Sequence, residues 1–232
     1  MTGSRAVTGS RAASGPRVTA VVFDLGGVIT ESPMAAFAAY EAEAGLPDGL
    51  IRRLNSTDPD TNAWARYERR ELDEAGFRAA FEAEAAAAGH TVDAGRVLAA
   101  LAGDLRPAMV AAVQRLRGAG LPLALLSNNV APMERTGRLG ELLGLFDAVV
   151  ESSVEGVRKP EPAIYGLALR RLSEAAGRSI AAEHCAYLDD LGINLKPARA
   201  MGFATVKVVD PAAVASASNA VRKPASSSSR RS

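Results

Sequence analysis

Five short runs rich in Val, Leu and Ile recur along the chain, and helix-forming stretches separate them. The runs cover residues 18–23, 121–126, 147–150, 184–188 and 204–209. Each is apolar at consecutive positions, which is the pattern of a strand buried on both faces. Strands of this kind that alternate with helices predict an α/β fold, in which helices cover both sides of a parallel sheet.

Two of the intervening stretches have clear helical periodicity. In PAMVAAVQRLRGAG, Met109, Val113 and Leu116 fall on one face, and glycines at the end supply stop signals. In PAIYGLALRRLSEAAG, Pro162 stands where the first turn of a helix tolerates proline. Both stretches are therefore predicted to be helices that cover the sheet.

The interval between the first and second apolar runs is too long for a single crossover. Most of it is alanine-rich and helical, including the stretch NAWARYERRELDEAGFRAAFEAEAAAAG. We therefore predict a core formed by residues 18–30 and 106–215, with an inserted helical cap at 31–105. An insertion after the first strand would lie over the carboxyl edge of the sheet, where open parallel sheets bind ligands.

The composition is that of an ordinary globular protein, with 48% hydrophobic and 23% charged residues. The formal net charge of +1 recommends neither nucleic acid nor an acidic membrane surface as a partner. No apolar run approaches the length of a membrane span. The lone Cys185 forms no internal disulfide and is interpreted as a core residue, so a reducing cytoplasm is the expected location. The low-complexity ends, residues 1–17 and 216–232, are interpreted as flexible tails.

Polar residues follow strands or precede a helix at four places in this scheme. They are Asp24, Ser127-Asn128, Arg158-Lys159-Pro160 and Asp189-Asp190. All four are predicted to converge on one edge of the sheet. Carboxylates brought together there repel one another unless a cation neutralises them, and oxygen ligands suit Mg²⁺. A lysine opposite them would hold a phosphate or another anion, while a hydroxyl and an amide supply oriented hydrogen bonds.

The order of DLGGV, LLSNN, RKPEPAIY and YLDDLGINLKPARAMG resembles the four motifs of the haloacid dehalogenase superfamily. The last two blocks are particularly similar to the phosphatase domain at the N-terminus of soluble epoxide hydrolases, and to related domains fused to some acyl-CoA dehydrogenases. The resemblance extends over nearly the whole chain between the two tails. It implies a hydrolase with a Rossmann-like core of about five strands and a helical cap.

The resemblance also implies a nucleophile and a metal site. Asp24 would form a covalent aspartyl intermediate and bind Mg²⁺ through its other oxygen. The backbone carbonyl of Gly26 and a carboxylate of the Asp189-Asp190 pair would complete the protein ligands, with both acids as candidates and Asp190 preferred over Asp189. Asn194 matches a polar position that supports the metal site.

A phosphate site is implied next to these groups. Ser127 and Asn128 would hold phosphoryl oxygens, and the Gly26-Gly27 turn would contribute to substrate binding. Lys159 would offset the negative charge of the nucleophile and the phosphate. The expected partner is a small phosphorylated substrate, and the expected chemistry is nucleophilic catalysis with a metal clamp.

The sequence departs from the family pattern at Gly26. Phosphatases of the family usually carry a second acid there, which protonates the leaving oxygen and then activates water. General acid catalysis is typically worth about 10²–10⁴-fold, so poorly activated phosphomonoesters are expected to be slow substrates.

The expected reaction is Mg²⁺-dependent hydrolysis of a small phosphorylated metabolite through an aspartyl-phosphate. One alternative is an enzyme of the same fold that acts on carbon–halogen bonds, and halide release would identify it. A second is a binding or regulatory module that keeps the anion site but turns over negligibly because Gly26 transfers no proton. Formation of a phospho-enzyme without steady turnover would favour that module.

Other polar and aromatic residues carry less weight. His90 and His184 lie far apart and have no serine or cysteine motif nearby, so surface or strand packing is expected of them. Trp64, Arg66 and Glu68 lie in the predicted cap within possible reach of a substrate. Because such helices are usually packed and solvated, we assign them no role in the site.

Overall fold

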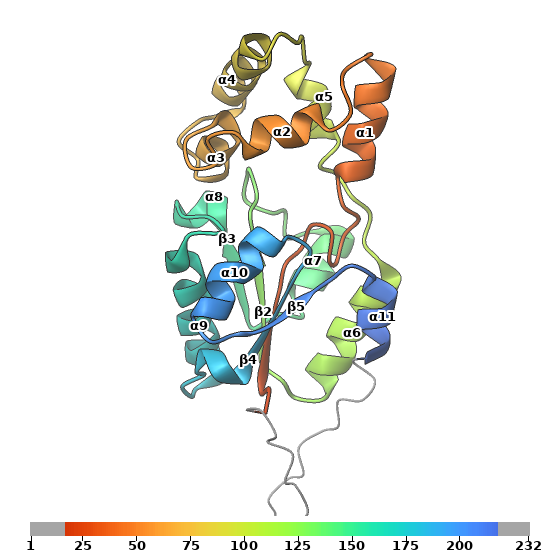
Figure 1. The fold of residues 1–232 in the computed structure, drawn as a ribbon. Helices are drawn as coiled ribbons and strands as arrows, with labels where there is room; N and C mark the ends of the chain where they lie inside the picture. The colour runs from red at the N-terminus through yellow and green to blue at the C-terminus, as the bar shows by residue number, and fades with distance from the viewer. Residues whose placement is uncertain (1–16, 218–232) are drawn as a thin grey trace, which may run out of the picture.

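Five parallel strands form one sheet in the order β3-β2-β1-β4-β5 (Figure 1). The strands are β1 (Ala20–Phe23), β2 (Leu123–Ser127), β3 (Ala148–Glu151), β4 (Cys185–Asp189) and β5 (Ala204–Lys207). The computed structural model describes residues 17–217. Each of the five predicted strands is found within three residues of its expected ends, and the predicted α/β fold with a parallel sheet is confirmed.

The first strand lies at the centre of the sheet, where the direction of strand addition reverses. β1 pairs with β2 on one side and with β4 on the other. The chain first builds outward through β2 and β3, and then returns to place β4 on the opposite side of β1. A crevice forms at the carboxyl ends of the strands at such a reversal point, which is where open α/β sheets bind ligands. Asp24 directly follows β1 and so lies at this point.

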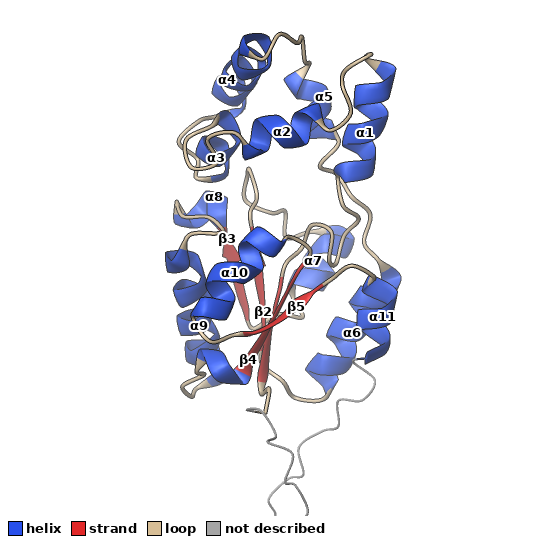
Figure 2. Ribbon diagram, in the orientation of Figure 1, coloured by secondary structure: helices blue, strands red, loops and turns tan. Residues whose placement is uncertain are grey.

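Helices cover both faces of the sheet, as the continuous apolar runs predict (Figure 2). Successive side chains of a strand point to opposite faces. On one face, Val22 of β1 packs in a cluster with residues of α9 (Pro162–Ala176) and α10 (Gly192–Ala200). On the other, Val21 packs in a cluster with residues of α6 (Pro107–Gly118), α7 (Gly137–Leu143) and α11 (Pro211–Ala217). The two helices predicted from periodicity are thus confirmed as α6 and α9.

Five helices between β1 and α6 form a separate layer above the carboxyl ends of the strands (Figure 1). They are α1 (Met34–Glu43), α2 (Leu50–Ser56), α3 (Ala63–Glu68), α4 (Glu74–Ala87) and α5 (Ala94–Ala99). Asn62 and Asp73 each accept a backbone hydrogen bond of 2.8 Å and so cap α3 and α4. These caps divide the long helical stretch of the sequence into two helices. The five helices have their own hydrophobic cluster, so we refer to them as the cap.

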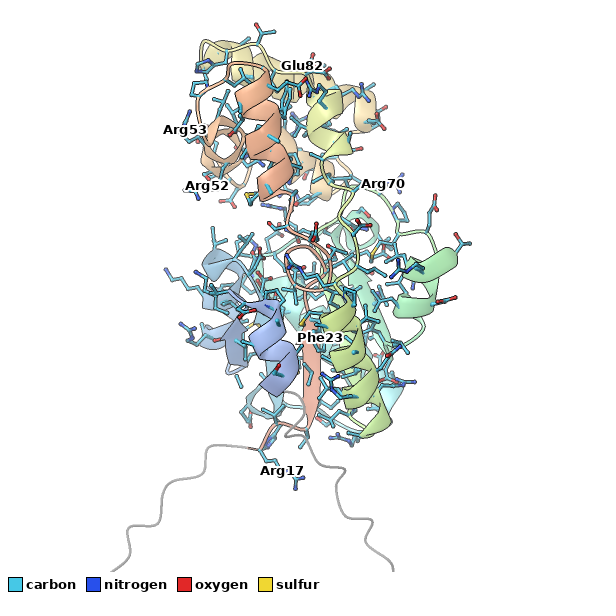
Figure 3. All side chains as sticks on the ribbon, turned by 90° about the vertical axis from the view of Figure 1, so that its right-hand side faces the viewer. Arg17, Phe23, Arg52, Arg53, Arg70 and Glu82 are labelled. Carbon is cyan, nitrogen blue, oxygen red and sulfur yellow. The ribbon has the colours of Figure 1, made fainter. Side chains whose placement is uncertain are left out.

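Two linkers join the cap to the core, and they run side by side. Thr30 and Leu105 form an antiparallel bridge between them. The backbone N–H of Arg106 donates to the carbonyl of Ile29 at 2.8 Å, and its Nε donates to the carbonyl of Thr30 at 3.0 Å. The narrow neck that results is visible between the two layers in Figure 3. The cap is therefore held to the core at one hinge-like crossing as well as through its lower surface.

The remaining elements are α8 (Ser152–Glu155) and the short 3₁₀ helix η1 (Ala182–His184). The predicted flexible tails fall outside the described residues except at their inner ends. There the expectation for the C-terminal tail is wrong by two residues, because α11 continues through Ala217. Among residues 17–217, no helix is long and apolar enough to cross a membrane.

Candidate active site

Asp24 and Lys159 form a buried ion pair at the carboxyl end of β1. Lys159 Nζ lies 2.7 Å from Asp24 Oδ1, and the backbone N–H of Leu25 donates to the same oxygen at 2.7 Å. Only 1% of Lys159 and 6% of Asp24 is exposed. Lys159 reaches the site from the loop between α8 and α9, where the Lys159–Pro160 peptide bond is cis. Both contacts fall on Oδ1, so the two oxygens of Asp24 have different surroundings.

The carboxylate of Asp189 lies beneath this pair and is saturated with donors. Lys159 Nζ lies 3.0 Å from its Oδ2, and the amide of Asn194 donates to both of its oxygens at 3.1 Å. The backbone N–H of Leu191 donates to Oδ1 at 2.8 Å, and the hydroxyl of Tyr187 donates to Oδ2. Asp189 is completely buried. A buried carboxylate with this many donors holds Lys159 in place, so it acts as a positioning group.

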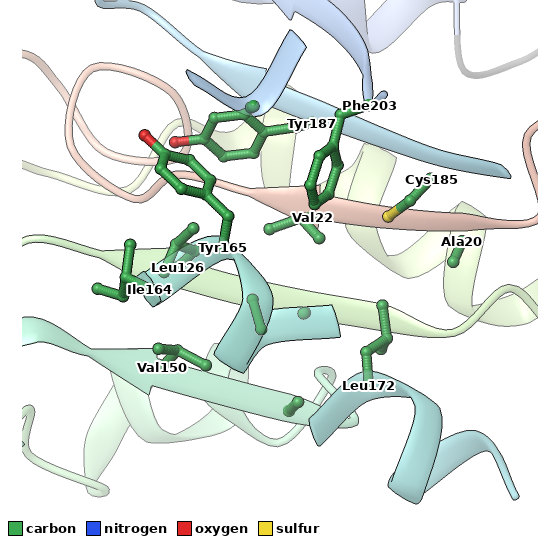
Figure 4. Packing of buried hydrophobic residues seen from close by; sticks show 14 of the residues in the cluster. Ala20, Val22, Leu126, Val150, Ile164, Tyr165, Leu172, Cys185, Tyr187 and Phe203 are labelled. Atoms are coloured by element: carbon green, nitrogen blue, oxygen red, sulfur yellow. The ribbon is translucent and has the colours of Figure 1, made fainter. Parts of the chain in front are cut away.

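Two tyrosines support this network, Tyr187 from β4 and Tyr165 from α9. Tyr165 donates to the backbone carbonyl of Asn194 at 2.8 Å, and its ring meets that of Tyr187 edge-on at 5.6 Å. Figure 4 shows both hydroxyls pointing toward the same end of the sheet. Burial, followed by the charge of Asp189, raises the pKa of Tyr187 well above its ordinary value. Tyr187 is therefore a neutral hydrogen-bond donor. The sequence analysis missed its role, because a tyrosine within a buried strand gives no signal beyond packing.

Three carboxylates surround the single ammonium of Lys159. Asp24, Asp189 and Asp190 each place an oxygen within 4.8 Å of the other two. Burial raises the pKa of Asp24 to about 8, with Lys159 opposing the rise and Asp189 and Asp190 adding to it. Burial and Asp189 likewise raise the pKa of Asp190. Burial by itself would lower the pKa of Lys159, but the neighbouring carboxylates outweigh it and raise that pKa. The site thus holds more negative charge than one lysine balances.

This acidic cluster has the donor chemistry of a hard divalent cation. Carboxylate oxygens are the ligands that Mg²⁺ prefers, and an added cation would oppose both the burial and the carboxylate repulsion that raise the pKa of Asp24. Because protein donors already occupy the oxygens of Asp189, Asp24 and Asp190 are left as the side chains that fit a cation. Gly26 lies in the same turn as Asp24, which the backbone hydrogen bond from Ile29 to Leu25 closes at 2.8 Å.

The two glycines after Asp24 differ in what they permit. Gly27 has a φ of +74°, and a Cβ there would lie 2.2 Å from Oδ2 of Asp190. Gly26 has no positive φ, and a Cβ there would meet nothing within 4 Å. The sequence analysis did not distinguish these two requirements. Gly27 is needed so that Asp190 can approach the turn, whereas the absence of an acid at Gly26 has no steric cause in the described residues.

Ser127 and Asn128 lie at the end of β2, beside the Lys159 loop. Ser127 is buried, and its hydroxyl makes only a long 3.4 Å contact to the carbonyl of Asn128. The amide of Asn128 donates to the carbonyl of Lys159 at 2.9 Å and accepts from the N–H of Lys159 at 2.8 Å. Its second N–H donates to Oε2 of Glu68 at 3.1 Å. Both amide hydrogens are therefore occupied by protein acceptors in this arrangement.

Glu68 connects the cap to this site, and it is buried rather than solvated in the packed and solvated helix that the sequence led us to expect. Only 7% of it is exposed, and its carboxylate accepts from Trp64, Asn128 and Arg158. Trp64 itself packs in the cap cluster, with its ring 5.4 Å from that of Phe77. A glutamate on a polar helix gives no sequence signal of this contact, because its two core partners, Asn128 and Arg158, come from distant loops.

Arg66 and the two histidines do not join the site. Arg66 lies 3.9 Å from Glu71 within the cap. His184 is exposed, and its Nδ1 lies 3.1 Å from the carbonyl of Arg17. Cys185 is buried as expected, and burial raises the pKa of its thiol to about 12. The site therefore combines the buried Asp24–Lys159 ion pair with an acidic cluster.

This arrangement is that of a known family. A family model described as haloacid dehalogenase-like hydrolase matches residues 18–202. The chain belongs to this family. The resemblance drawn from the four motifs is thereby confirmed, and this haloacid dehalogenase-like hydrolase is an enzyme by descent as well as by its arrangement of side chains.

The sequence of this chain is similar to those of curated proteins with different names, among them three that differ in how much of their length it spans. Mouse acyl-CoA dehydrogenase family member 10 is 33% identical over 83% of this chain, which spans 18% of that protein. Pig bifunctional epoxide hydrolase 2 is 28% identical over 82% of the chain, which spans 36% of it. The sesquiterpene phosphatase astK of Aspergillus oryzae is 26% identical over 82% of this chain and 90% of its own length. The chain thus spans only a minor part of the first two relatives.

Solved structures share the fold of this hydrolase. A dehalogenase with an intermediate complex aligns with a TM-score of 0.60 at 18% identity, covering 83% of this chain and 85% of the other. A HAD family enzyme of Bacteroides thetaiotaomicron, in complex with magnesium and inorganic phosphate, aligns with a TM-score of 0.53 at 21% identity, covering 82% and 93%. These alignments support the α/β fold with its Rossmann-like core.

Proposed function

We propose that this hydrolase is a phosphatase that acts on a small phosphorylated metabolite through an aspartyl-phosphate. The observation that carries the proposal is the cluster of Asp24, Asp189 and Asp190 around Lys159. A phosphoryl group brings negative charge to its site, and a cation bound by the acids would help Lys159 to balance that charge. Displacement of a halide has no evident use for an acid pair. The relatives named as phosphatases support the same choice.

One carboxylate oxygen of Asp24 would attack the phosphorus atom, and its other oxygen would face the cation. The bond between phosphorus and the leaving oxygen breaks, and its electron pair goes to the leaving group. Water then attacks the phosphorus of the acyl phosphate, which releases inorganic phosphate and restores the Asp24 carboxylate. Lys159 holds Oδ1 of Asp24 and balances the charge that gathers during both steps.

Mg²⁺ is the cofactor that the donor set fits; Asp24 and Asp190 would be its side-chain ligands, and the carbonyl of Gly26 would be a further candidate. When bound, it supplies positive charge against the phosphoryl oxygens. Ser127, with its long hydroxyl contact, is available to a phosphoryl oxygen. The amide of Asn128 is engaged with Lys159 and Glu68, so its contribution to substrate binding would require a change of partners.

A screen that measures phosphate and halide release in parallel tests this proposal. The panel contains sugar, acyl, aryl and terpenoid phosphates and a 2-haloacid, each with and without Mg²⁺. We expect Mg²⁺-dependent phosphate release from at least one phosphate, and its loss in Asp24→Asn. Halide release without phosphate release would favour the dehalogenase alternative. A burst of phospho-enzyme without steady turnover would favour the regulatory alternative.

A further inference from the structure

Glu68 is a buried acid on the cap whose carboxylate is shared between the cap and the core. Its Oε1 accepts from Nε1 of Trp64 at 3.0 Å, which is a contact within α3. Its Oε2 accepts from Nδ2 of Asn128 at 3.1 Å and from Nε of Arg158, and both of these belong to the core. Buried carboxylates persist only when they are paired and hydrogen-bonded, and the core supplies the charged partner here.

The two core residues that Glu68 contacts, Arg158 and Asn128, are both attached to the backbone of Lys159. Arg158 directly precedes Lys159 in the chain. Asn128 accepts from the backbone N–H of Lys159 at 2.8 Å and donates to its carbonyl at 2.9 Å, so one amide holds both backbone polar groups of that residue. A primary amide has two N–H groups, and Glu68 takes the second. The orientation of the Asn128 amide is thereby fixed by three contacts.

We propose that Glu68 is a positioning residue for Lys159. From the cap, it fixes Asn128 and Arg158, and these fix the backbone of Lys159 so that Nζ lies 2.7 Å from Asp24. The contact of the cap with the core is thus linked, through Glu68, to the placement of Lys159 beside Asp24. The kinetic part of this inference rests on the proposed phosphatase activity, whereas its structural part does not.

Other contacts hold the cap to the core without touching the Asn128 amide. Arg69 of the cap lies 3.4 Å from Glu161, and Nη1 of Arg158 donates to the carbonyl of Pro59 at 2.9 Å. Neither contact involves the Glu68 carboxylate, so we expect both to remain when it is neutralised. Glu68→Gln should therefore loosen the hold on Lys159 while the cap stays in place.

Hydrogen exchange followed by mass spectrometry tests the positioning role without any turnover. In Glu68→Gln we expect exchange in the peptide containing residues 158–161 to accelerate about tenfold, as loss of one charge-assisted hydrogen bond predicts, while the peptide of α4 keeps its protection. The matched control is Glu43→Gln, which removes an exposed cap carboxylate that pairs with Arg96 inside the cap. It should leave both peptides unchanged.

Steady-state kinetics on the best substrate of the screen give the second readout. Glu68→Gln should lower kcat about tenfold and leave KM within about threefold, because misplacement of Lys159 affects the reacting groups more than binding. Unchanged exchange at residues 158–161, or equal acceleration there and in α4, would overturn the inference, and so would an unchanged kcat. Absence of phosphate release by the wild-type protein would count against the proposed function, while the exchange measurement still decides the positioning role.

Discussion

Lys159 Nζ lies 2.7 Å from Asp24 Oδ1 in a site where the lysine is only 1% exposed. The two residues come from opposite parts of the chain, and Asp189 holds the lysine from below at 3.0 Å. An ammonium so enclosed is stabilised by its carboxylates, and these in turn depend on the ammonium. This mutual dependence gives the site consequences for stability as well as for catalysis.

Lys159→Met should destabilise the fold strongly. Removing one partner of a buried charge pair leaves uncompensated carboxylates, at a cost of about 3–5 kcal/mol in the free energy of unfolding. Lys196→Met is the control, because Lys196 is exposed and should change that free energy by less than about 0.5 kcal/mol. Urea denaturation measures both. Equal stability of the two variants would contradict the buried pair.

The two acids after β4 should have separate roles. Asp190→Asn should weaken Mg²⁺ binding in calorimetry while the fold stays intact, because Asp190 is one of the two side chains left to bind a cation. Asp189→Asn should chiefly reduce stability, since Asp189 accepts from Lys159, Tyr187 and Asn194. If metal affinity in Asp190→Asn matched that of the wild-type protein, this metal site would be ruled out.

Gly26→Asp should fold, because a Cβ at this position meets nothing within 4 Å and the backbone has no positive φ. The new acid would supply the missing proton donor and should raise the rate on an alkyl phosphate more than on an aryl phosphate, by up to about 10²-fold. The ratio of the two rates, compared with that of the wild-type protein after circular dichroism, is the measurement. An unchanged ratio would mean that proton transfer comes from another group.

Gly27→Ala should disturb the turn that Gly26→Asp leaves intact. Its φ of +74° already strains an L-residue, and the Cβ would lie 2.2 Å from Oδ2 of Asp190. Gly177→Ala is a matched control, because Gly177 has a φ of +63° with nothing within 4 Å of its Cβ. Both variants should lose about 1–2 kcal/mol of stability from the backbone, but only Gly27→Ala should also lose Mg²⁺ affinity. Retained affinity in Gly27→Ala would show that Asp190 is not placed by this glycine.

Much of the site follows from the sequence because a parallel sheet brings the ends of its strands to one edge. Asp24, Ser127 and Asp189 each stand at the carboxyl end of an apolar run, so their convergence needed only the strand assignments. Lys159 needed more. It lies in a loop well after β3, and Asn128 holds the backbone of that loop through contacts that no local pattern encodes.

Other features of the site could not be inferred from sequence at all. The difference between Gly26 and Gly27 lies in a backbone angle and in the approach of Asp190, neither of which composition reveals. Glu68 has the sequence context of a solvated helix residue, and it is buried only because α3 rests on two core loops. Contacts between the cap and the core depend on how the two layers meet, which is a property of the tertiary structure.

The central claim is that Asp24 carries the phosphoryl group during turnover. The most direct test is to mix the protein with Mg²⁺ and an active phosphate, quench in acid within one turnover, and map the peptide that spans Asp24 by mass spectrometry. We predict one phosphoryl group on Asp24, and neither this adduct nor phosphate release in a folded Asp24→Asn variant. Phosphate release without a phosphorylated Asp24, or an Asp24→Asn variant that keeps about a tenth of the wild-type rate, would contradict the claim.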